Sequence, residues 1–198
     1  MEHWAVAFEC VIKRRDARCL HPSMAPPALH HLLQYNQHQD ELGHCCALLW
    51  DMREPPRSAA RHVSAPDRPL SEFELTQHAT NPPVTVLRVT CGVFPEASWV
   101  SEARNWLGVT VKNVLDAIST TMGTQISYPE WDKLCPKQQN RVNVVFDARW
   151  RGSADPTEVR AHGVLRSDCL LQHIHFAGLS IEPESEDTYF LTLKRPKR

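Results

Sequence analysis

The sequence predicts an α+β protein with a mainly antiparallel sheet and about three helices packed on one face. The first observation is that strand-like and helix-like segments come in blocks along the chain, which is typical of α+β domains. The second is residues 84–90, where side chains alternate as in a β-strand. The third is residues 111–121, where apolar residues recur at i, i+3, i+4 and i+7, as on one buried face of a helix.

A buried strand at residues 47–53 is the centre of the predicted fold. The apolar residues on one face of this strand are Leu48, Trp50 and Met52. Pro55 and Pro56 follow it and end it, because proline has no N–H group to donate to a neighbouring strand. Asp51 and Arg53 project from the opposite face. They are interpreted either as an ion pair that fixes the exit of the strand or as site residues at a strand end.

Local signals predict the remaining elements. The expected helices are residues 111–121, 128–134 and 137–150. Thr110 is the expected N-cap of the first helix, and Gly123 is its expected left-handed stop. Ser127 begins an S-x-x-E capping box before the second helix, and Pro136 opens the third. Further expected strands are residues 98–100, 159–164, 169–175 with 179–181 as an extension, and 188–193.

The first seventy residues contain fewer clear signals. We expect residues 28–35 to be helical or irregular, residues 36–44 to form a polar loop, and residues 56–69 to form a mobile surface loop. Residues 1–27 are expected to be an N-terminal arm or linker, in which residues 4–12 fit a helix and a strand equally well.

One domain is expected at residues 28–193, followed by a basic tail at 194–198. The tail is interpreted as a solvated C-terminus, with nuclear import or a weak nucleic-acid contact as the alternatives.

A length of 198 residues, with 42% hydrophobic and 23% charged residues, fits one globular domain. A net charge of −1 argues against nucleic-acid binding, and no apolar run is long enough to predict a membrane span.

Cysteine usage and the N-terminus predict an intracellular protein. The seven cysteines are an odd number and form no C-x-x-C pair, which favours free thiols in a reducing compartment. No signal peptide is expected, because the basic residues 13–15 follow the apolar stretch instead of preceding it. The expected location is the cytoplasm, with the nucleus as an alternative, and not the secretory pathway.

Four segments carry a family resemblance. They are residues 49–56 (LWDMREPP), 79–83 (ATNPP), 109–118 (VTVKNVLDAI) and 176–179 (FAGL). In this order they resemble an uncharacterised domain family abundant in mushroom-forming fungi, with the motifs W-D-x-R-x-P-P, A-T-x-P-P and F-x-G-L. The resemblance covers roughly residues 29–181. It implies a shared architecture and a fungal source, and it implies no reaction.

His173 and His175 are the strongest candidates for functional residues. Members of that family tend to have a basic or small residue in this part of the penultimate strand. On a strand the two imidazoles would face the same way, and a third ligand from elsewhere would complete an open metal site. The candidate third ligands are Asp51, His162, Asp168 and Glu182. No cofactor is firmly predicted. A divalent metal remains an alternative to two polar residues on the solvent face of a sheet.

Two functions follow as hypotheses. The first is a ligand-binding or protein-interaction module whose six tryptophans suit an apolar groove. Its partner would be a small apolar molecule or a protein, with a homodimer among the alternatives, and neither nucleic acid nor a membrane.

The second hypothesis is a small enzyme, cofactor-free or metal-assisted, that acts on an apolar substrate of the kind found in secondary metabolism. Its acid–base set would come from Asp51, Arg53, His173 and His175. It predicts that at least two of these four side chains meet within hydrogen-bond reach in one concave pocket.

Overall fold

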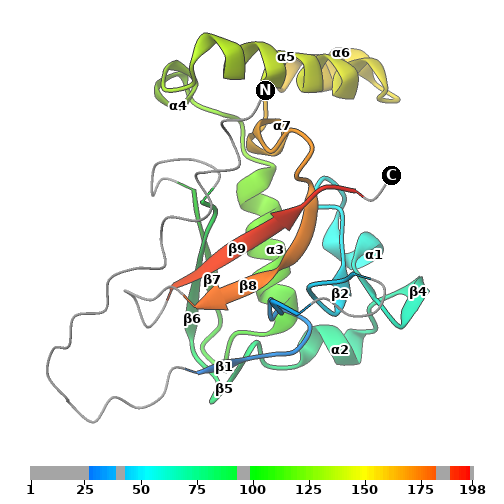
Figure 1. Ribbon diagram of the computed structural model, residues 1–198, viewed down its shortest axis with the longest axis vertical. Coiled ribbons are helices and arrows are strands. Elements are labelled where there is room, and N and C mark those ends of the chain that lie inside the picture. The colour runs from blue at the N-terminus through cyan, green and yellow to red at the C-terminus, as the bar shows by residue number, and fades with distance from the viewer. Residues whose placement is uncertain (1–26, 39–42, 93–98, 182–187, 197–198) are drawn as a thin grey trace, which may run out of the picture.

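The computed structural model describes residues 27–38, 43–92, 99–181 and 188–196. The predicted α+β class is confirmed, since the described residues form seven helices and three small sheets whose strand pairs are antiparallel with one exception (Figure 1). The undecided segment at residues 4–12 lies outside the described residues. Among the described helices, none combines the length and the apolar character that crossing a lipid bilayer requires.

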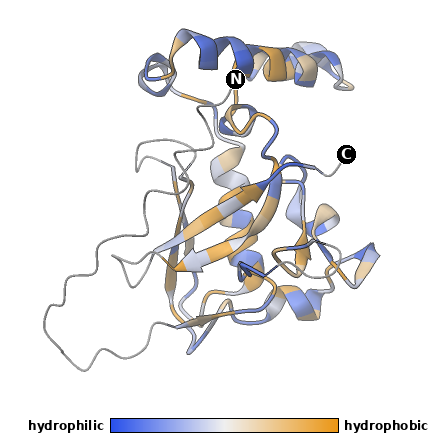
Figure 2. Cartoon of the chain, in the orientation of Figure 1, coloured by the Kyte–Doolittle hydropathy of each residue, from blue (hydrophilic) through white to orange (hydrophobic). Residues whose placement is uncertain are grey.

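The largest sheet has four strands in the order β7-β6-β9-β8. Its strands are β6 (Val86–Thr90), β7 (Val100–Arg104), β8 (His175–Ile181) and β9 (Thr188–Lys194). The pairs β6–β7 and β8–β9 are antiparallel, and β6–β9 is parallel. The strands predicted at residues 84–90 and 188–193 are therefore confirmed. Figure 2 shows β8 and β9 as mainly hydrophobic strands at the centre of the molecule.

The predicted central strand joins this sheet to a second one. Its first part is β2 (Leu48–Leu49), which pairs with β3 (Arg61–His62), and β3 in turn pairs with β4 (Ala65–Pro69). Its second part runs along β8: Met52 N donates to Ile174 O at 2.9 Å, and Phe176 N donates to Trp50 O at 3.0 Å. The side chains of Leu48, Trp50 and Met52 are all buried, as the alternation predicts.

A two-stranded sheet ties the start of the described chain to its middle. It pairs β1 (Ala28–Leu29) with β5 (Thr80–Asn81), so residues 28–35 begin as a short strand before they form a turn. The bond between Asn81 and Pro82 is cis. Thr80 stabilises this turn, because its buried hydroxyl donates to the Pro82 carbonyl and accepts from Val84 N.

The central helix is α3 (Val111–Met122), which begins at Thr110 with the predicted capping. Its buried residues are Val111, Val114, Leu115, Ile118 and Met122. It lies behind the four-stranded sheet in Figure 1 and contacts β7, α1 (Pro56–Ala59) and α2 (Glu72–Thr76). Gly123 follows the helix with φ −77°, so the predicted left-handed stop is wrong, because a right-handed residue ends this helix.

The other helices gather at one end of the molecule, across the top of Figure 1. They are α4 (Tyr128–Asp132), α5 (Pro136–Arg151), α6 (Pro156–Ala161) and α7 (Arg166–Cys169). The capping box at Ser127 and the start of a helix behind Cys135 are confirmed. Trp99, Leu134, Val142 and Cys169 form a small apolar core of their own here. The helices therefore do not form one layer on the sheet, because α4, α5 and α7 contribute to this second core and α6 packs on α5.

Two predicted strands are wrong. Residues 159–161 are the second half of α6, which begins here because the Asp155 side chain caps it by accepting from Glu158 N and Pro156 occupies its first position. Residues 162–164 form the turn and loop after it. Residues 169–175 end α7, pass through a turn and reach the sheet only at His175.

The expected loop at residues 56–69 is also wrong. It contains α1 and the β3–β4 hairpin, since Pro55 and Pro56 end a strand and at the same time begin a helix.

Candidate functional site

Asp51 and Arg53 lie where the central strand leaves β8, and they pair with each other. Arg53 Nε donates to Asp51 Oδ1 at 3.0 Å, and Nη2 donates to Oδ2 at 2.6 Å. The backbone N of Arg53 also donates to Oδ1 at 3.0 Å. Partial burial raises the pKa of Asp51, but the hydrogen bonds and the charge of Arg53 outweigh it and hold that pKa below its ordinary value. Both carboxylate oxygens are therefore occupied.

His175 faces this pair from β8. An isolated antiparallel bridge joins it to Asp51, and its Nε2 lies 4.0 Å from Asp51 Oδ2. Partial burial lowers the pKa of His175, the cations Lys194 and Arg53 lower it further, and Asp51 opposes them. The imidazole is therefore mainly neutral at pH 7, and its distance from the carboxylate exceeds a hydrogen bond.

His173 has a different partner. It lies in the turn before β8, where its Nε2 accepts a hydrogen bond from Arg195 Nε at 3.1 Å. Because guanidinium nitrogens only donate, Nε2 of His173 is unprotonated in this contact. Burial lowers the pKa of His173, and the charges of Arg195 and Arg141 lower it further. Of the four predicted site residues, three thus lie together and His173 contacts the start of the basic tail.

Of the candidate third metal ligands, only Asp51 lies beside one of these histidines, and its oxygens already accept from Arg53. Asp168 is buried against Arg149, and His162 Nδ1 contacts the Glu158 carbonyl oxygen at the end of α6. Glu182 lies outside the described residues. Within the ranges that the structure describes, no group of three or more histidine, cysteine, aspartate or glutamate side chains could hold a metal ion.

A histidine cluster that the sequence did not predict lies between β1, β3 and α2. The ring centres of His30 and His31 are 4.3 Å apart, and those of His31 and His62 are 6.2 Å apart. His30 Nε2 lies 2.5 Å from Gln77 Oε1. Burial and the neighbouring histidines lower the pKa of His31, and Glu74 opposes them. No spacing signal could have found this cluster, because distant parts of the chain supply it.

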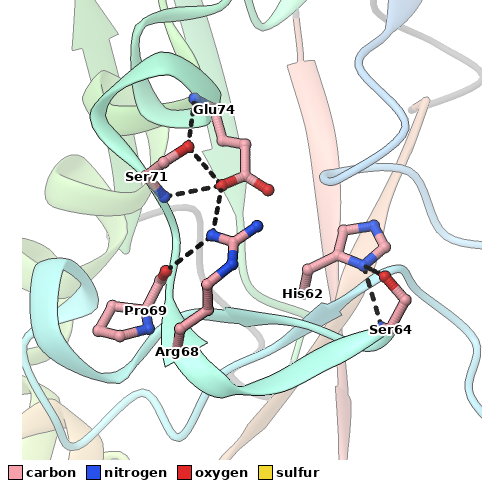
Figure 3. Close-up of polar contacts among 6 residues, drawn as sticks. All are labelled: His62, Ser64, Arg68, Pro69, Ser71 and Glu74. Carbon is pink, nitrogen blue, oxygen red and sulfur yellow. Dashed lines mark hydrogen bonds and ion pairs between the residues drawn. The ribbon is translucent and has the colours of Figure 1, made fainter.

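The polar contacts beside this cluster serve the local backbone (Figure 3). His62 Nδ1 accepts from Ser64 N at 3.0 Å within the β3–β4 turn. Glu74 caps α2 through Ser71 and also pairs with Arg68. The hydrogen bonds from Ser71 and Arg68 lower the pKa of Glu74 to about 2. Figure 3 shows the His62 and Glu74 groups as two separate sets of contacts, so they do not form one catalytic relay.

A shallow hollow of about 350 Å³ lies between α5 and α6 and is open to solvent. It is lined by Trp150, Pro156, Thr157, Arg160 and Ala161. The guanidinium carbons of Arg151 and Arg160 lie 5.0 and 5.3 Å from the centre of the Trp150 ring, which are cation–π distances. Arg151 also pairs with Asp147, whereas Arg160 has no ion pair within the described part of the chain.

Residues 48–188 match the model of a family described as "Family of unknown function (DUF6699)". The chain belongs to this family. No curated protein and no solved structure matches the chain. The DUF6699 region contains Asp51, Arg53, His173, His175 and the hollow, whereas the His30–His31 side of the histidine cluster and Arg195 lie beyond it.

Two buried thiols, those of Cys46 and Cys169, are poor nucleophiles. Burial raises the pKa of Cys46 to about 11 and that of Cys169 to about 12. Both are therefore protonated at neutral pH, and a protonated thiol neither attacks nor binds metal well. Both side chains are packed in the apolar cores of the molecule, where they serve as inert small residues.

The lowered histidine pKa values predict that the protein loses stability on acidification. In the folded state the pKa values of His31, His173 and His175 lie below 6.5, their ordinary value. The unfolded chain therefore binds more protons just below pH 6.5, and falling pH favours unfolding. We expect the free energy of unfolding, measured by urea titration, to fall between about pH 7.5 and pH 5.

The substitution His175→Asn should reduce this pH dependence, because it removes one of the three groups. Glu74 and Glu130, each with a pKa of about 2 in the folded state, stay ionised there throughout this range. In the unfolded chain their ordinary pKa is 4.5, so they add to the loss of stability only as the pH approaches 5. If the free energy of unfolding of His175→Asn falls with pH as steeply as that of the wild type, the lowered pKa assigned to His175 is wrong.

Proposed function

We propose that this protein is a protein-interaction module that uses the hollow between α5 and α6 to bind an acidic segment of a partner protein. The observation that carries the proposal is the Trp150 indole flanked by the guanidinium groups of Arg151 and Arg160. Tryptophan and arginine are the residues most enriched among strong contributors to protein–protein binding energy. Such a pair presents an apolar surface and a positive charge side by side.

The chemistry of the lining indicates the ligand class. Trp150, Pro156 and Ala161 offer apolar surface, and Arg160 offers a cation without an intramolecular ion pair in the described part of the chain. A carboxylate of the partner would pair with Arg160 while an adjacent apolar side chain covers the indole. An open hollow does not enclose a small molecule, since small-molecule sites bury most of the ligand surface. It suits one or two side chains of a protein segment.

A matched pair of variants tests this proposal. The probe is a library of acidic peptides, each with one proline or aromatic residue, displayed on beads. We expect the protein to enrich sequences with an acidic residue beside the apolar one. Binding to the enriched peptides should weaken about 10-fold or more in Arg160→Glu, because a charge-assisted contact becomes a repulsion. Arg141→Glu makes the same charge change on the exposed side of α5 and should leave binding unchanged.

Two outcomes would count against this function. One is a library without enrichment, and the other is equal binding by the Arg160→Glu and Arg141→Glu variants. Catalysis by Asp51 and His175 has weaker support, because Arg53 occupies both oxygens of Asp51 and His175 lies 4.0 Å away. A turnover that His175→Ala abolished without a loss of thermal stability would favour the enzyme instead.

A further inference from the structure

Among the described residues, the four-stranded sheet has one covered edge and one edge to which no further strand is paired. At the β8 edge, residues 50–52 bond to residues 174 and 176, and Tyr35 N donates to Leu179 O at 2.9 Å. At the other edge, β7 pairs with β6 and with no other strand in the described part of the chain. An open strand edge carries unpaired N–H and C=O groups and can accept another strand.

The register of β6 and β7 shows which backbone groups point outward. Asn105 N donates to Thr85 O at 3.0 Å, in line with the register in which residue 104 opposes residue 86. In an antiparallel ladder, every second residue bonds to the same neighbour. Ser101 and Ala103 therefore bond to β6, like Asn105, while the backbone groups of Val100, Glu102 and Arg104 point away from the sheet.

We propose that the outer edge of β7 pairs antiparallel with β7 of a second copy of this chain. In a twofold arrangement, residues with outward backbone groups must face one another. Pairing Glu102 with Glu102, or Arg104 with Arg104, would set like charges opposite each other. Pairing Glu102 with Arg104 of the second copy places Ala103 on the twofold axis and forms two opposite-charge pairs.

The same register brings apolar surface together. On each side of the axis it brings Val100 of one copy toward the turn after β7 of the other copy, which contains Trp106. Val100 is 36% exposed, and the turn residues Trp106 and Leu107 are 83% and 65% exposed. Large apolar side chains at this exposure gain by association. The self-pairing thus satisfies the open backbone groups, matches the charges and covers the exposed indole.

The competing explanation is that the charges protect the edge of a monomer. Within one chain, Glu102 contacts Arg88 Nε at 2.9 Å and Arg104 Nε at 2.5 Å. If this network only keeps other strands away, reversing one charge will not weaken an association. The two explanations therefore differ in their response to charge reversal.

Sedimentation velocity of the full chain at roughly 5 to 500 µM decides between them, a range suited to a small interface. We expect a monomer–dimer equilibrium that Arg104→Glu or Glu102→Arg alone weakens about 10-fold or more, because each sets two like-charge pairs across the axis. The double variant Glu102→Arg with Arg104→Glu exchanges the charges and should restore the wild-type constant to within about 3-fold.

Arg57→Glu reverses an exposed charge on α1 and serves as the control, with no expected change. Circular dichroism of each variant checks that the fold is kept. Three results would overturn the proposal: a wild-type chain that stays monomeric at the highest concentration, a dimer indifferent to the single reversals, or a double variant as weak as the single ones. A monomer would also leave the edge available to a strand of another protein.

Discussion

Asp168→Ala is expected to lower the free energy of unfolding by about 3 to 5 kcal/mol, the usual effect of removing one partner of a buried ion pair. The Asp168 side chain is 3% exposed. Its two oxygens accept from Arg149 Nε and Nη2, both at 2.8 Å, and Oδ2 also accepts from Leu165 N at 2.8 Å. These bonds join α5 to the start of α7. Without the carboxylate, the Arg149 guanidinium stays largely buried and loses its counter-ion.

Asp116→Ala is the matched control for this measurement. Asp116 pairs with Lys112 one turn earlier on α3, but both side chains are more than 40% exposed. Exposed pairs of this kind contribute about 0.5 kcal/mol or less. In urea titrations, the loss in the free energy of unfolding should therefore be several-fold larger for Asp168→Ala than for Asp116→Ala. A loss below about 1 kcal/mol for Asp168→Ala would mean that water or a repacked side chain replaces the carboxylate.

Elements with a strong local signal were predictable from the sequence. The helix at Val111–Met122 has both a capping residue and a regular apolar face, and the strand at Val86–Thr90 has a clear alternation. The segments around residues 160 and 170 misled the prediction, because short apolar runs fit strands and helices alike. At these two places the helix is favoured by Asp155, which caps α6, and by the ion pair of the buried Asp168 with Arg149, which is a tertiary contact.

The candidate site was predictable only where its members are close in the sequence. Asp51 and Arg53 are two residues apart, and the alternation of the predicted strand places them on one side. They do pair, but Arg53 lies in the turn that follows Asp51, and its backbone N donates to the Asp51 side chain. Their approach to His175 depends on how the central strand runs along β8, which no local pattern encodes. The histidine cluster and the hollow around Trp150 join separate elements in the same way.

The segments on which the family resemblance rests have structural roles. Trp50 is buried against Phe176, with ring centres 6.0 Å apart. Thr80 holds the turn before Val84, and Thr110 caps α3. Each of these residues fixes a junction between elements. This explains why these segments indicate an architecture and do not indicate a reaction.

The last of these segments contains a glycine whose replacement should have a large effect. Gly178 has φ +116°, a conformation that only glycine adopts readily, and a Cβ atom there would lie 2.6 Å from Tyr35 N and Cα. Those are backbone atoms of the segment that covers the β8 edge, so they cannot move aside as a flexible side chain would. Backbone strain and overpacking each contribute roughly 1 to 3 kcal/mol. We expect Gly178→Ala to destabilise the fold by about 4 kcal/mol.

Gly92→Ala provides the control, since a Cβ atom at Gly92 would have no neighbour within 4 Å. It should change the free energy of unfolding by about 0.5 kcal/mol or less. In Gly178→Ala, amide hydrogen exchange should become faster around Tyr35 and Leu179, whose backbone groups bond to each other. Equal stabilities of the two variants would contradict the close crossing of these segments. A large loss confined to Gly178→Ala would mean that the F-x-G-L segment requires glycine because a second backbone segment crosses β8 at that point.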